Sequence, residues 1–239
     1  MARLATALLM ILAIGCASPT GADGADGQPG ASASSSGWVS LFDGETLDGW
    51  HGYNREDVPG GWSVDEGTLH FTPGGDGGDL LTDASYDDFE LELEWKVAEC
   101  GNSGIFYTVE EIPALRAAWM TGLEMQVLDN TCHGDAKYPS HRAGALYDLY
   151  VPTAEVARPG GEWNQVRIVF SNGQIEHWLN GRKIVEADMN STDWTARVAA
   201  SKFRDEDDFP AYGTRRSGRI GVQDHGDPVW YRNIRVRRL

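Results

Sequence analysis

Strict alternation of apolar and charged residues over positions 88–97 constrains the fold of this chain more than any other feature. The segment reads DFELELEWKV, so its apolar side chains fall on one face and its charged side chains on the other. A period of two is typical of a β-strand that buries one face, whereas an amphipathic helix has a period of 3.6 residues. The segment therefore predicts a strand of an antiparallel sheet with one solvated face.

Two Asn-Gly pairs, at positions 172–173 and 180–181, lie between short strand-like runs. Asn-Gly favours the tight turn that joins two antiparallel strands, because both residues tolerate a positive φ. Residues 165–170, 174–179 and 182–185 therefore predict two consecutive hairpins.

Further strands are predicted along the chain. They cover residues 62–64, 68–71, 103–109, 123–128, 145–150, 219–223 and 229–236, with one short helix at 192–202. Many short strands separated by turn signals are typical of an all-β sandwich. No internal repeat of fixed period is present, which argues against a propeller or a solenoid. We therefore expect a single all-β domain over residues 38–239.

The residues before position 38 are predicted to be an export signal and a tether. A short apolar run behind Arg3 is typical of a signal peptide at residues 1–15, too short to span a bilayer. Cys16 follows a glycine, which resembles a bacterial lipobox with Cys16 as the lipidated residue; signal cleavage nearby, which would discard Cys16, is the alternative. Residues 16–37 then form a flexible tether, because they contain few large apolar side chains. We expect the domain in the cell envelope, facing the periplasm or the cell surface and touching the membrane through its lipid anchor only.

Charge and cysteine content narrow the partners and the compartment further. The chain has 20 Lys and Arg against 36 Asp and Glu, a net charge of −16, which would repel the phosphates of a nucleic acid. Nucleic acid is therefore not expected as a partner. Cys100 and Cys132 are the cysteines left after Cys16. Disulfides persist outside the cytoplasm, so we expect these two residues to form one.

Polar residues interrupt the apolar pattern at the predicted strands. Glu124 and Gln126 share one face of the segment GLEMQVLDN, and Gln223 and His225 share one face of GVQDHG. Asn102 lies between two glycines at the start of another strand. Polar groups beside aromatic residues suit a carbohydrate cleft, because sugars offer both hydroxyls and apolar ring faces. The alternative for each residue is structural, as a solvent-facing strand residue or a turn residue.

The loop at residues 132–148 also concentrates ionisable side chains. It contains His133, His141, Arg142, Tyr147 and Asp148. The two histidines lack the close spacing of a zinc motif such as H-E-x-x-H. No nucleophile elbow, Walker loop or dinucleotide fingerprint is present elsewhere in the sequence.

These segments, taken together and in order, resemble the 3-keto-disaccharide hydrolase domain family. The resemblance covers nearly all of residues 38–239. The segments that carry it are WVSLFDGETLDGW (38–50), GWSVDEGTLHF (61–71), GNSGIFY (101–107), GLEMQVLDN (122–130), RAGALYDL (142–149), EWNQVR (162–167), EHWLNG (176–181), SKF (201–203) and the end of the chain from residue 218.

The resemblance implies a fold and a chemistry. The fold is a concanavalin A-like jelly-roll β-sandwich, and the substrate is a 3-keto glycoside or another carbohydrate. A ketone at C3 acidifies the proton on C2, so a base can form an enediolate that expels the C1 aglycone. Water then adds to the enone. This route needs a base near C2 and a donor on the enolate oxygen, but no pair of carboxylates flanking the glycosidic bond.

The resemblance and the residue types together suggest roles. Glu124, expected in an exposed cleft, or His225 is the candidate base. The acid or electrophile is expected from His133, His141 or Lys202. Sugar hydroxyls are expected to bind Asn102, Gln126, Asn130, Arg142, Tyr147 and Gln223. No cofactor is fixed by these motifs; a divalent cation is the alternative electrophile, with Glu124, Asp129, His133 and His141 as candidate ligands.

Two other functions remain open at the level of sequence. This fold also hosts lectins, so the domain could be a carbohydrate-binding module without catalysis. It could also be an envelope lipoprotein that binds another protein. Incubation with a 3-keto glucoside separates the three, because release of the aglycone, binding without turnover and absence of binding each point to one of them.

Overall fold

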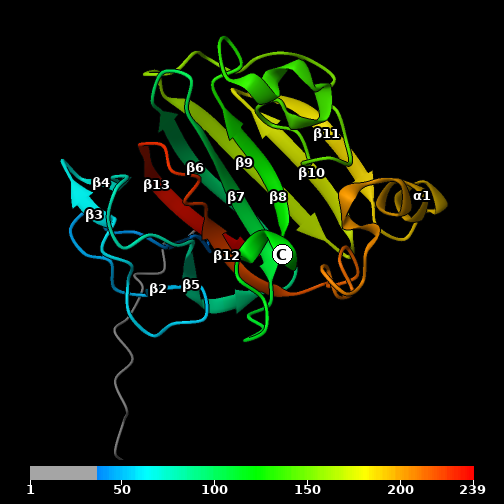
Figure 1. Ribbon diagram of the computed structural model, residues 1–239, viewed down its shortest axis with the longest axis horizontal. Coiled ribbons are helices and arrows are strands. Elements are labelled where there is room, and N and C mark those ends of the chain that lie inside the picture. Colours follow the sequence, from blue (N-terminus) through cyan, green and yellow to red (C-terminus); the bar gives the residue numbers. More distant parts are fainter. Residues whose placement is uncertain (1–36) are drawn as a thin grey trace, which may run out of the picture. The chain divides into compact units, whose positions relative to one another are not determined.

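The computed structural model describes residues 37–239. The predicted signal peptide, the lipidation of Cys16 and nearly all of the predicted tether lie outside these residues. Two antiparallel sheets pack face to face, which confirms the all-β jelly-roll sandwich (Figure 1). No helix within the described part of the chain combines the length and apolar character that a membrane crossing needs.

One layer is an eight-stranded sheet in the order β11-β10-β9-β6-β13-β4-β3, with β1 also paired to β13. Its strands are β1 (Val39–Ser40), β3 (Trp62–Asp65), β4 (Thr68–Phe71), β6 (Phe89–Val97), β9 (Asn164–Ser171), β10 (Gln174–Leu179), β11 (Arg182–Asp188) and β13 (Val229–Arg238). Both hairpins predicted from Asn-Gly are present, since β9 pairs with β10 and β10 with β11.

The other layer is a five-stranded sheet in the order β2-β5-β12-β7-β8. Its strands are β2 (Trp50–Gly52), β5 (Leu80–Tyr86), β7 (Asn102–Val109), β8 (Leu123–Leu128) and β12 (Gly218–Val222). The chain passes repeatedly between the two sheets, for example from β6 to β7 and from β12 to β13. These crossings make the sandwich one continuous unit around a shared core.

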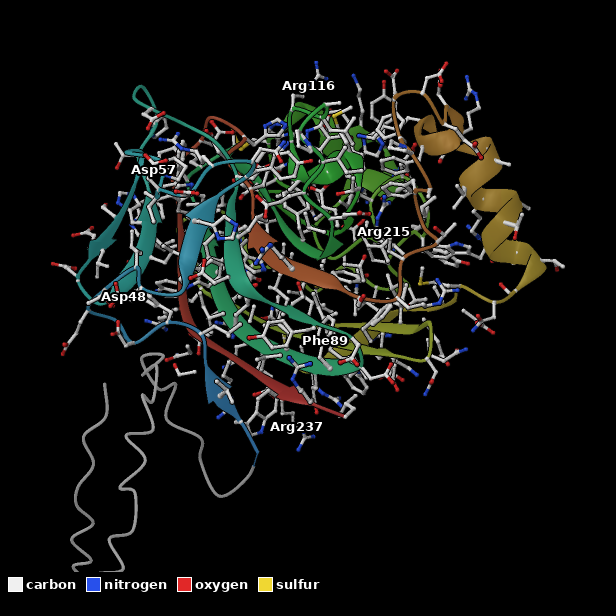
Figure 2. All side chains as sticks on the ribbon, turned by 90° about the horizontal axis from the view of Figure 1, so that it is seen from below. Asp48, Asp57, Phe89, Arg116, Arg215 and Arg237 are labelled. Atoms are coloured by element: carbon white, nitrogen blue, oxygen red, sulfur yellow. A yellow bond between two sulfur atoms is a disulfide. The ribbon has the colours of Figure 1, made fainter. Side chains whose placement is uncertain are left out.

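The core lies between the inner faces of the two sheets. Trp95, Tyr107 and Tyr231 are fully buried there. Phe89 packs its ring 6.2 Å from that of Tyr107 across the layers, and Figure 2 shows Phe89 inside the sandwich. The Tyr107 hydroxyl finds a partner across the sheets, 2.9 Å from Nε2 of His177, whereas the indole nitrogen of Trp95 has none among the residues that the structure describes. Burial of these large rings supplies most of the driving force for packing the two sheets.

The outer face of the eight-stranded sheet carries charged side chains in rows. Glu92 pairs with Arg235 and Glu94 pairs with Arg232, each across the β6–β13 ladder. Glu90 contacts both Arg167 and Arg237, and its side chain is only 5 % exposed. The alternation at 88–97 therefore has the predicted inner face, but its outer face is a network of ion pairs rather than isolated solvated charges.

The short strands β1 and β2 were not predicted, and two longer segments also depart from the predicted elements. Residues 145–150 do not form a strand: Leu146 makes only isolated bridges to Met125 and Tyr150. Gly144 and Asp148 have positive φ values of 85° and 59°, which interrupt extended backbone. Strand β5 was not predicted, because Leu80 faces the core while Leu81 is buried in a second apolar cluster on the opposite face. Burial on both faces removes the period of two.

Short helices complete the domain. The helix predicted at 192–202 is divided into α1 (Thr192–Ala200) and a 3-10 turn, η4 (Lys202–Arg204), with Ser201 between them. The other 3-10 turns are η1 (Ala118–Met120), η2 (Gly134–Lys137) and η3 (Pro139–His141). They lie in the loops that follow β7 and β8, so they supply side chains beside the five-stranded sheet.

Candidate functional site

The outer face of the five-stranded sheet carries the polar residues that the sequence singled out. In β8, Met125 and Val127 point into the core, so Glu124 and Gln126 point to the opposite face. The β7–β8 register sets Gly104 opposite Gln126 and Phe106 opposite Glu124. Asn102 alternates with these β7 positions and therefore shares their face. The predicted placement of Glu124 and Gln126 on one face is confirmed, and the structure adds Asn102 to that face.

A cavity of about 190 Å³ lies on this face. It is lined by Asn102, Trp119, Glu124, Gln126, Tyr147, Lys202, Gln223 and His225. Three walls come from loops: Trp119 from η1, Tyr147 from the segment after η3, and Lys202 from the start of η4. The cavity is smaller than the roughly 300–1,000 Å³ typical of sites for drug-sized ligands. It therefore suits one small polar ring rather than an extended chain.

A larger hollow of about 890 Å³ lies over the other sheet, between β1, β6, β9 and β13. Its glutamates and arginines are paired within the protein, since Glu92 binds Arg235, Glu94 binds Arg232 and Arg167 binds Glu90. No buried group with a perturbed proton affinity lies in it. Size alone would favour this hollow, but the chemistry favours the smaller cavity.

Glu124 is buried to an extent that the sequence did not predict. Only 4 % of the residue is exposed, so the expectation of an exposed cleft carboxylate is wrong. Burial raises the pKa of Glu124 to about 8, and the nearby negative charge of Asp79 acts in the same direction, while Lys202 partly offsets both. Gly104 makes room for it, because a Cβ at that position would collide with the Glu124 carboxylate. A carboxylate of this kind is a strong base once it is ionised.

Lys202 provides a cation in the lining of the same cavity. Its Nζ lies 4.4 Å from the ring centre of Tyr147 and 4.8 Å from that of Trp119. The residue as a whole is exposed, although its ammonium lies against these rings. Burial of the ammonium lowers the pKa of Lys202, although the charges of Glu124 and Asp148 partly oppose the shift. The aromatic faces keep the ammonium directed into the cavity.

Gln126 holds the Glu124 carboxylate through its amide. Of the two possible orientations of the amide, one lets the side-chain nitrogen donate to Oε1 of Glu124 at 2.9 Å and to the Ser103 carbonyl at 3.1 Å. The amide oxygen then faces Asn102, whose side chain lies 3.3 Å away. The far end of Asn102 lies 3.4 Å from Nε2 of His225. These contacts form a chain of polar groups from Glu124 to His225 along the floor of the cavity.

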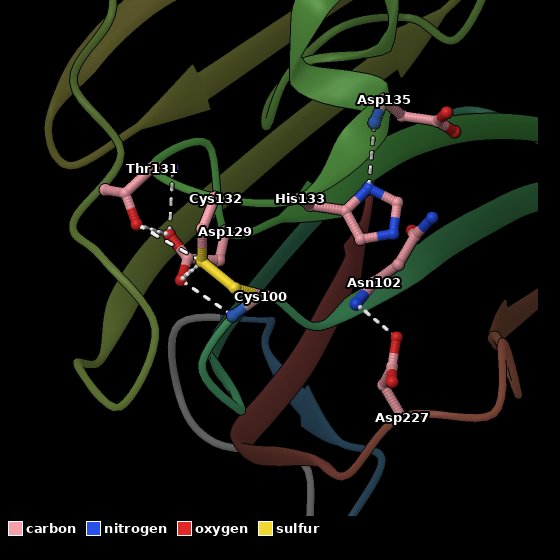
Figure 3. Close-up of a disulfide and its surroundings, with 8 residues drawn as sticks. All are labelled: Cys100, Asn102, Asp129, Thr131, Cys132, His133, Asp135 and Asp227. Atoms are coloured by element: carbon pink, nitrogen blue, oxygen red, sulfur yellow. Dashed lines mark hydrogen bonds between the residues drawn. A yellow bond between two sulfur atoms is a disulfide. The ribbon is translucent and has the colours of Figure 1, made fainter.

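Backbone contacts fix the loop that carries His225. The backbone N–H of Asn102 donates to Oδ2 of Asp227 at 3.0 Å, as Figure 3 shows. Asp79 accepts from the backbone N–H of Asp224 at 3.2 Å and from that of Ala118 at 2.9 Å. Burial raises the pKa of Asp79 to about 7. One carboxylate thus positions both the His225 loop and the turn that carries Trp119.

Asp79 and Trp119 are the residues of this site that sequence reasoning missed. Trp119 lies in an apolar loop segment with no strand period, so nothing in the pattern indicated that it lines a polar cavity. Asp79 follows two glycines at the start of an unpredicted strand. The Gly-Gly-Asp turn was the available signal, but such turns are common in loops.

Three of the predicted site residues do not line the cavity. His133 caps η2 by accepting from the backbone N–H of Asp135 at 3.1 Å. Asn130 accepts from the backbone N–H of Ala143 at 2.9 Å, which ties two loops together. Arg142 donates to the Ala136 carbonyl at 2.7 Å and pairs with Glu155. Their side chains are occupied in holding the 130–142 loop, which corrects their assignment to hydroxyls or to proton transfer.

His141 contacts the cavity only through another residue. Its Nδ1 lies 3.3 Å from the Tyr147 hydroxyl, and its Nε2 lies 3.5 Å from Oδ1 of Asp148. The other Asp148 oxygen accepts from the backbone N–H of Lys202 at 2.9 Å. Asp148 has a positive φ of 59°, a strained conformation for a residue with a side chain. It thereby joins the Tyr147 segment to the turn that presents Lys202.

Cys100 and Cys132 form a disulfide, as the sequence predicted (Figure 3). It ties the start of β7 to the loop after β8, beside Asp129, whose carboxylate accepts from the backbone N–H of Cys100 at 2.9 Å. Within residues 37–239, the metal-ligand types Cys, Asp, Glu and His gather closely only at Cys100, Asp129 and Cys132. Both sulfurs there are bonded to each other. The structure does not bring Glu124, Asp129, His133 and His141 together as one metal site.

Comparison with known proteins places this geometry in a family. The profile of the 3-keto-alpha-glucoside-1,2-lyase-like domain matches residues 37–237. A protein of Bacteroides thetaiotaomicron named 3-keto-disaccharide hydrolase is 38% identical over 229 residues, covering 85% of this chain and 79% of its own.

Solved structures agree with the fold. A crystal structure from Parabacteroides distasonis, described as a candidate glycosyl hydrolase, is 33% identical with a TM-score of 0.79, covering 85% of this chain and 94% of its own. A second candidate glycosyl hydrolase from the same organism is 28% identical with a TM-score of 0.66, covering 84% of this chain and 99% of its own. These similarities run through nearly the whole described domain.

Proposed function

Because this chain belongs to the 3-keto-alpha-glucoside-1,2-lyase-like domain family, we propose that it cleaves 3-keto glycosides by eliminating the aglycone across C1 and C2. The observation that carries the proposal is the buried Glu124 carboxyl, with a pKa of about 8, facing a small cavity that also holds the Lys202 ammonium. A base and a cation on one cavity are the two groups that this elimination requires.

In the first step, the Glu124 carboxylate removes the proton from C2 of the bound sugar. The electron pair of that C–H bond forms a C2–C3 double bond, and the C3 carbonyl oxygen becomes an enolate. Lys202 stabilises this negative oxygen through its ammonium, because a cation enclosed by aromatic rings is poorly screened by water.

In the second step, the enolate restores its carbonyl and the C1–oxygen bond breaks. The departing oxygen takes a proton from water and leaves as the free aglycone alcohol, so the ring product is an enone between C1 and C3. Water can add to that enone, with its oxygen on C1 and a proton on C2, to give the free 3-keto sugar. The proton on Glu124 exchanges with solvent while the enone is bound, so the proton that Glu124 delivers to C2 comes from water.

The titration of the two groups gives the reaction its pH dependence. Glu124 acts as a base only when ionised, so the rate rises as the pH approaches its pKa of about 8. Lys202 acts only when protonated, and its pKa lies below the usual value for lysine. The rate therefore falls again at higher pH, which gives a bell-shaped profile with an alkaline optimum. His225, the second candidate base, lies at an exposed end of the cavity, which favours Glu124.

The test is incubation of the full domain with an aryl 3-keto glucoside in deuterated water. Release of the aglycone with deuterium at C2 of the sugar product supports elimination and readdition. Release of the aglycone without deuterium at C2 contradicts the proposed mechanism while leaving a hydrolase. Sugar binding without release supports a carbohydrate-binding module instead.

We also propose that the domain is held at the cell envelope by a lipid on Cys16. The support is the apolar run ending in Gly15-Cys16 at the start of the sequence. The full-length Cys16→Ser variant should lose lipid labelling and leave the membrane fraction. A variant that stays with the membrane would contradict the anchor.

A further inference from the structure

Gln223 follows the end of β12, and its position is fixed by its backbone. Its N–H donates to the Gly104 carbonyl at 3.0 Å, and its carbonyl accepts from the Ser103 hydroxyl at 2.7 Å. Both contacts are to β7, the strand that forms the floor of the cavity. The side chain therefore enters the cavity from an anchored point rather than from a mobile loop.

The side-chain oxygen of Gln223 is buried and unpaired. The residue is only 6 % exposed, and its Oε1 has no hydrogen-bond partner among the residues that the structure describes. Nearly all buried polar groups in folded proteins have a partner, because an unpaired one has lost its water without compensation. This oxygen is exceptional in the site, since the Gln126 side chain contacts those of both Glu124 and Asn102.

The missing partner must be a hydrogen-bond donor. A sugar hydroxyl can donate to an amide oxygen, whereas a ketone oxygen can only accept. Lys202, by contrast, offers only donors, and its ammonium faces the same cavity. The cavity thus has an acceptor without a donor at Gln223 and a donor group at Lys202, and a 3-keto sugar carries the complement of both.

We propose that Gln223 is a specificity-determining residue whose Oε1 accepts a hydrogen bond from one hydroxyl of the bound sugar, so that the C3 ketone lies toward Lys202. The proposal rests on the proposed function and adds the orientation of the ring. With the ketone at Lys202, the adjacent C2 carbon is directed to Glu124, the other group of the cavity that the reaction needs. A sugar that lacks the hydroxyl leaves Oε1 unpaired and is rejected.

The experiment compares an aryl 3-keto glucoside with its 4-deoxy and 6-deoxy analogues, in the wild type and in Gln223→Met. Methionine keeps the length of the side chain and removes the amide. We expect the wild type to lose on the order of 10²-fold or more in kcat/KM on one of the two analogues. Gln223→Met should lose a similar factor on the parent sugar and discriminate little between the parent and that analogue.

Gln174→Met is the matched control, because Gln174 is exposed at the start of β10 in the other sheet. It should keep the wild-type activity and discrimination. If Gln223→Met fails to fold, Gln223→Asn is the second variant, because it keeps the amide group on a shorter side chain that no longer reaches the sugar. The same loss of discrimination is expected.

Unchanged discrimination in the folded Gln223 variant, or equal activity of the wild type on all the sugars, overturns the proposal. These outcomes are distinct from failure of the proposed function, which is absence of turnover of the parent sugar by the wild type. In that case the same comparison is made with dissociation constants. Loss of discrimination in binding supports the role of Gln223 in a binding module, and absence of any binding overturns both proposals.

Discussion

Glu90 and Glu124 are equally buried, at 4 % exposure each, on the outer faces of opposite sheets. Glu90 lies between two arginines, Arg167 and Arg237, which neutralise it. Glu124 has no arginine; its hydrogen-bond partner is the neutral amide of Gln126, and its pKa is raised to about 8. Burial alone therefore does not make a carboxyl reactive.

The difference extends to the surroundings of each glutamate. Ion pairs repeat along β6 and β13, so the glutamates and arginines of these strands that line the large hollow neutralise one another. The face of β7 and β8 holds a carboxyl with a raised pKa, a lysine with a lowered pKa and an unpaired amide oxygen. Perturbed and unpaired groups gathered in one cavity are typical of functional sites, where structure is arranged for a ligand.

The sharpest test of this comparison is one substitution made at both glutamates. Glu124→Gln removes the base while keeping its shape, so kcat/KM for a 3-keto glucoside should fall by about 10²–10⁴-fold. Glu90→Gln should leave the activity of the folded protein near that of the wild type. Steady-state kinetics on both variants, with folding checked by circular dichroism, measures the contrast. Equal activity in the two variants would remove Glu124 from the mechanism.

A smaller loss is expected when a lysine is exchanged on each face. Lys202→Met removes the cation beside the enolate oxygen, and the activity should fall by about 10²-fold, the usual effect of losing one electrostatic stabiliser. Lys183→Met removes a lysine that pairs with Glu176 and Glu186 on the other sheet, and the activity should not change. The falling limb of the pH profile should disappear in Lys202→Met alone. If Lys202→Met keeps the loss of activity at high pH, that loss is caused by the titration of another group.

The sequence predicted the strands of the sandwich where one face is buried and the other solvated, as in β6, β9 and β10. It failed at β5, where Leu80 and Leu81 are buried on opposite faces, and at residues 145–150, where Asp148 adopts a positive φ. The local sequence pattern indicates a strand when one of its faces is buried and the other is solvated. It does not indicate that a loop will cover the second face.

The same limit applies to the site. Glu124 and Gln126 were grouped correctly, because the strand period places them on one face, whereas the β7–β8 register that adds Asn102 was not predictable from the local pattern. His133, Asn130 and Arg142 were placed in the site by residue type, yet they hold loops through backbone contacts. Whether a polar side chain faces a ligand or a neighbouring backbone group depends on the path of the loop, which sequence pattern does not specify.

The two glutamates should also differ in their effect on folding. The pKa of Glu124 rises from an ordinary 4.5 in the unfolded chain to about 8 in the folded protein, so folding takes up a proton between these values. The stability from this group is present below pH 4.5 and is lost as the pH rises toward and through 8. Glu124→Gln cannot ionise, so it should exceed the wild type in stability by a few kcal/mol, on the order of the shift, near pH 8.

Denaturant unfolding at pH 5 and pH 8 measures this difference. The gap between Glu124→Gln and the wild type should widen from pH 5 to pH 8. Glu90→Gln should be less stable than the wild type at both pH values, because it leaves Arg167 and Arg237 without their carboxylate. If the difference in the free energy of unfolding between Glu124→Gln and the wild type is the same at both pH values, the pKa of Glu124 is not raised by folding. The proposed difference between Glu124 and Glu90 is then wrong.

The smallest effect is expected for an exposed ion pair on the outer face of the eight-stranded sheet. Arg235 pairs with Glu92, but its side chain is 52 % exposed and that of Glu92 is 30 % exposed. Water and salt screen such a pair, so Arg235→Gln should lower the free energy of unfolding by only about 0.2–1 kcal/mol, and less in 1 M salt. Activity should not change, since Arg235 lies on the sheet opposite the cavity. A loss of several kcal/mol would show that the ion pairs of β6 and β13 act together as a network, and a loss of activity would show that the two faces are coupled through the core.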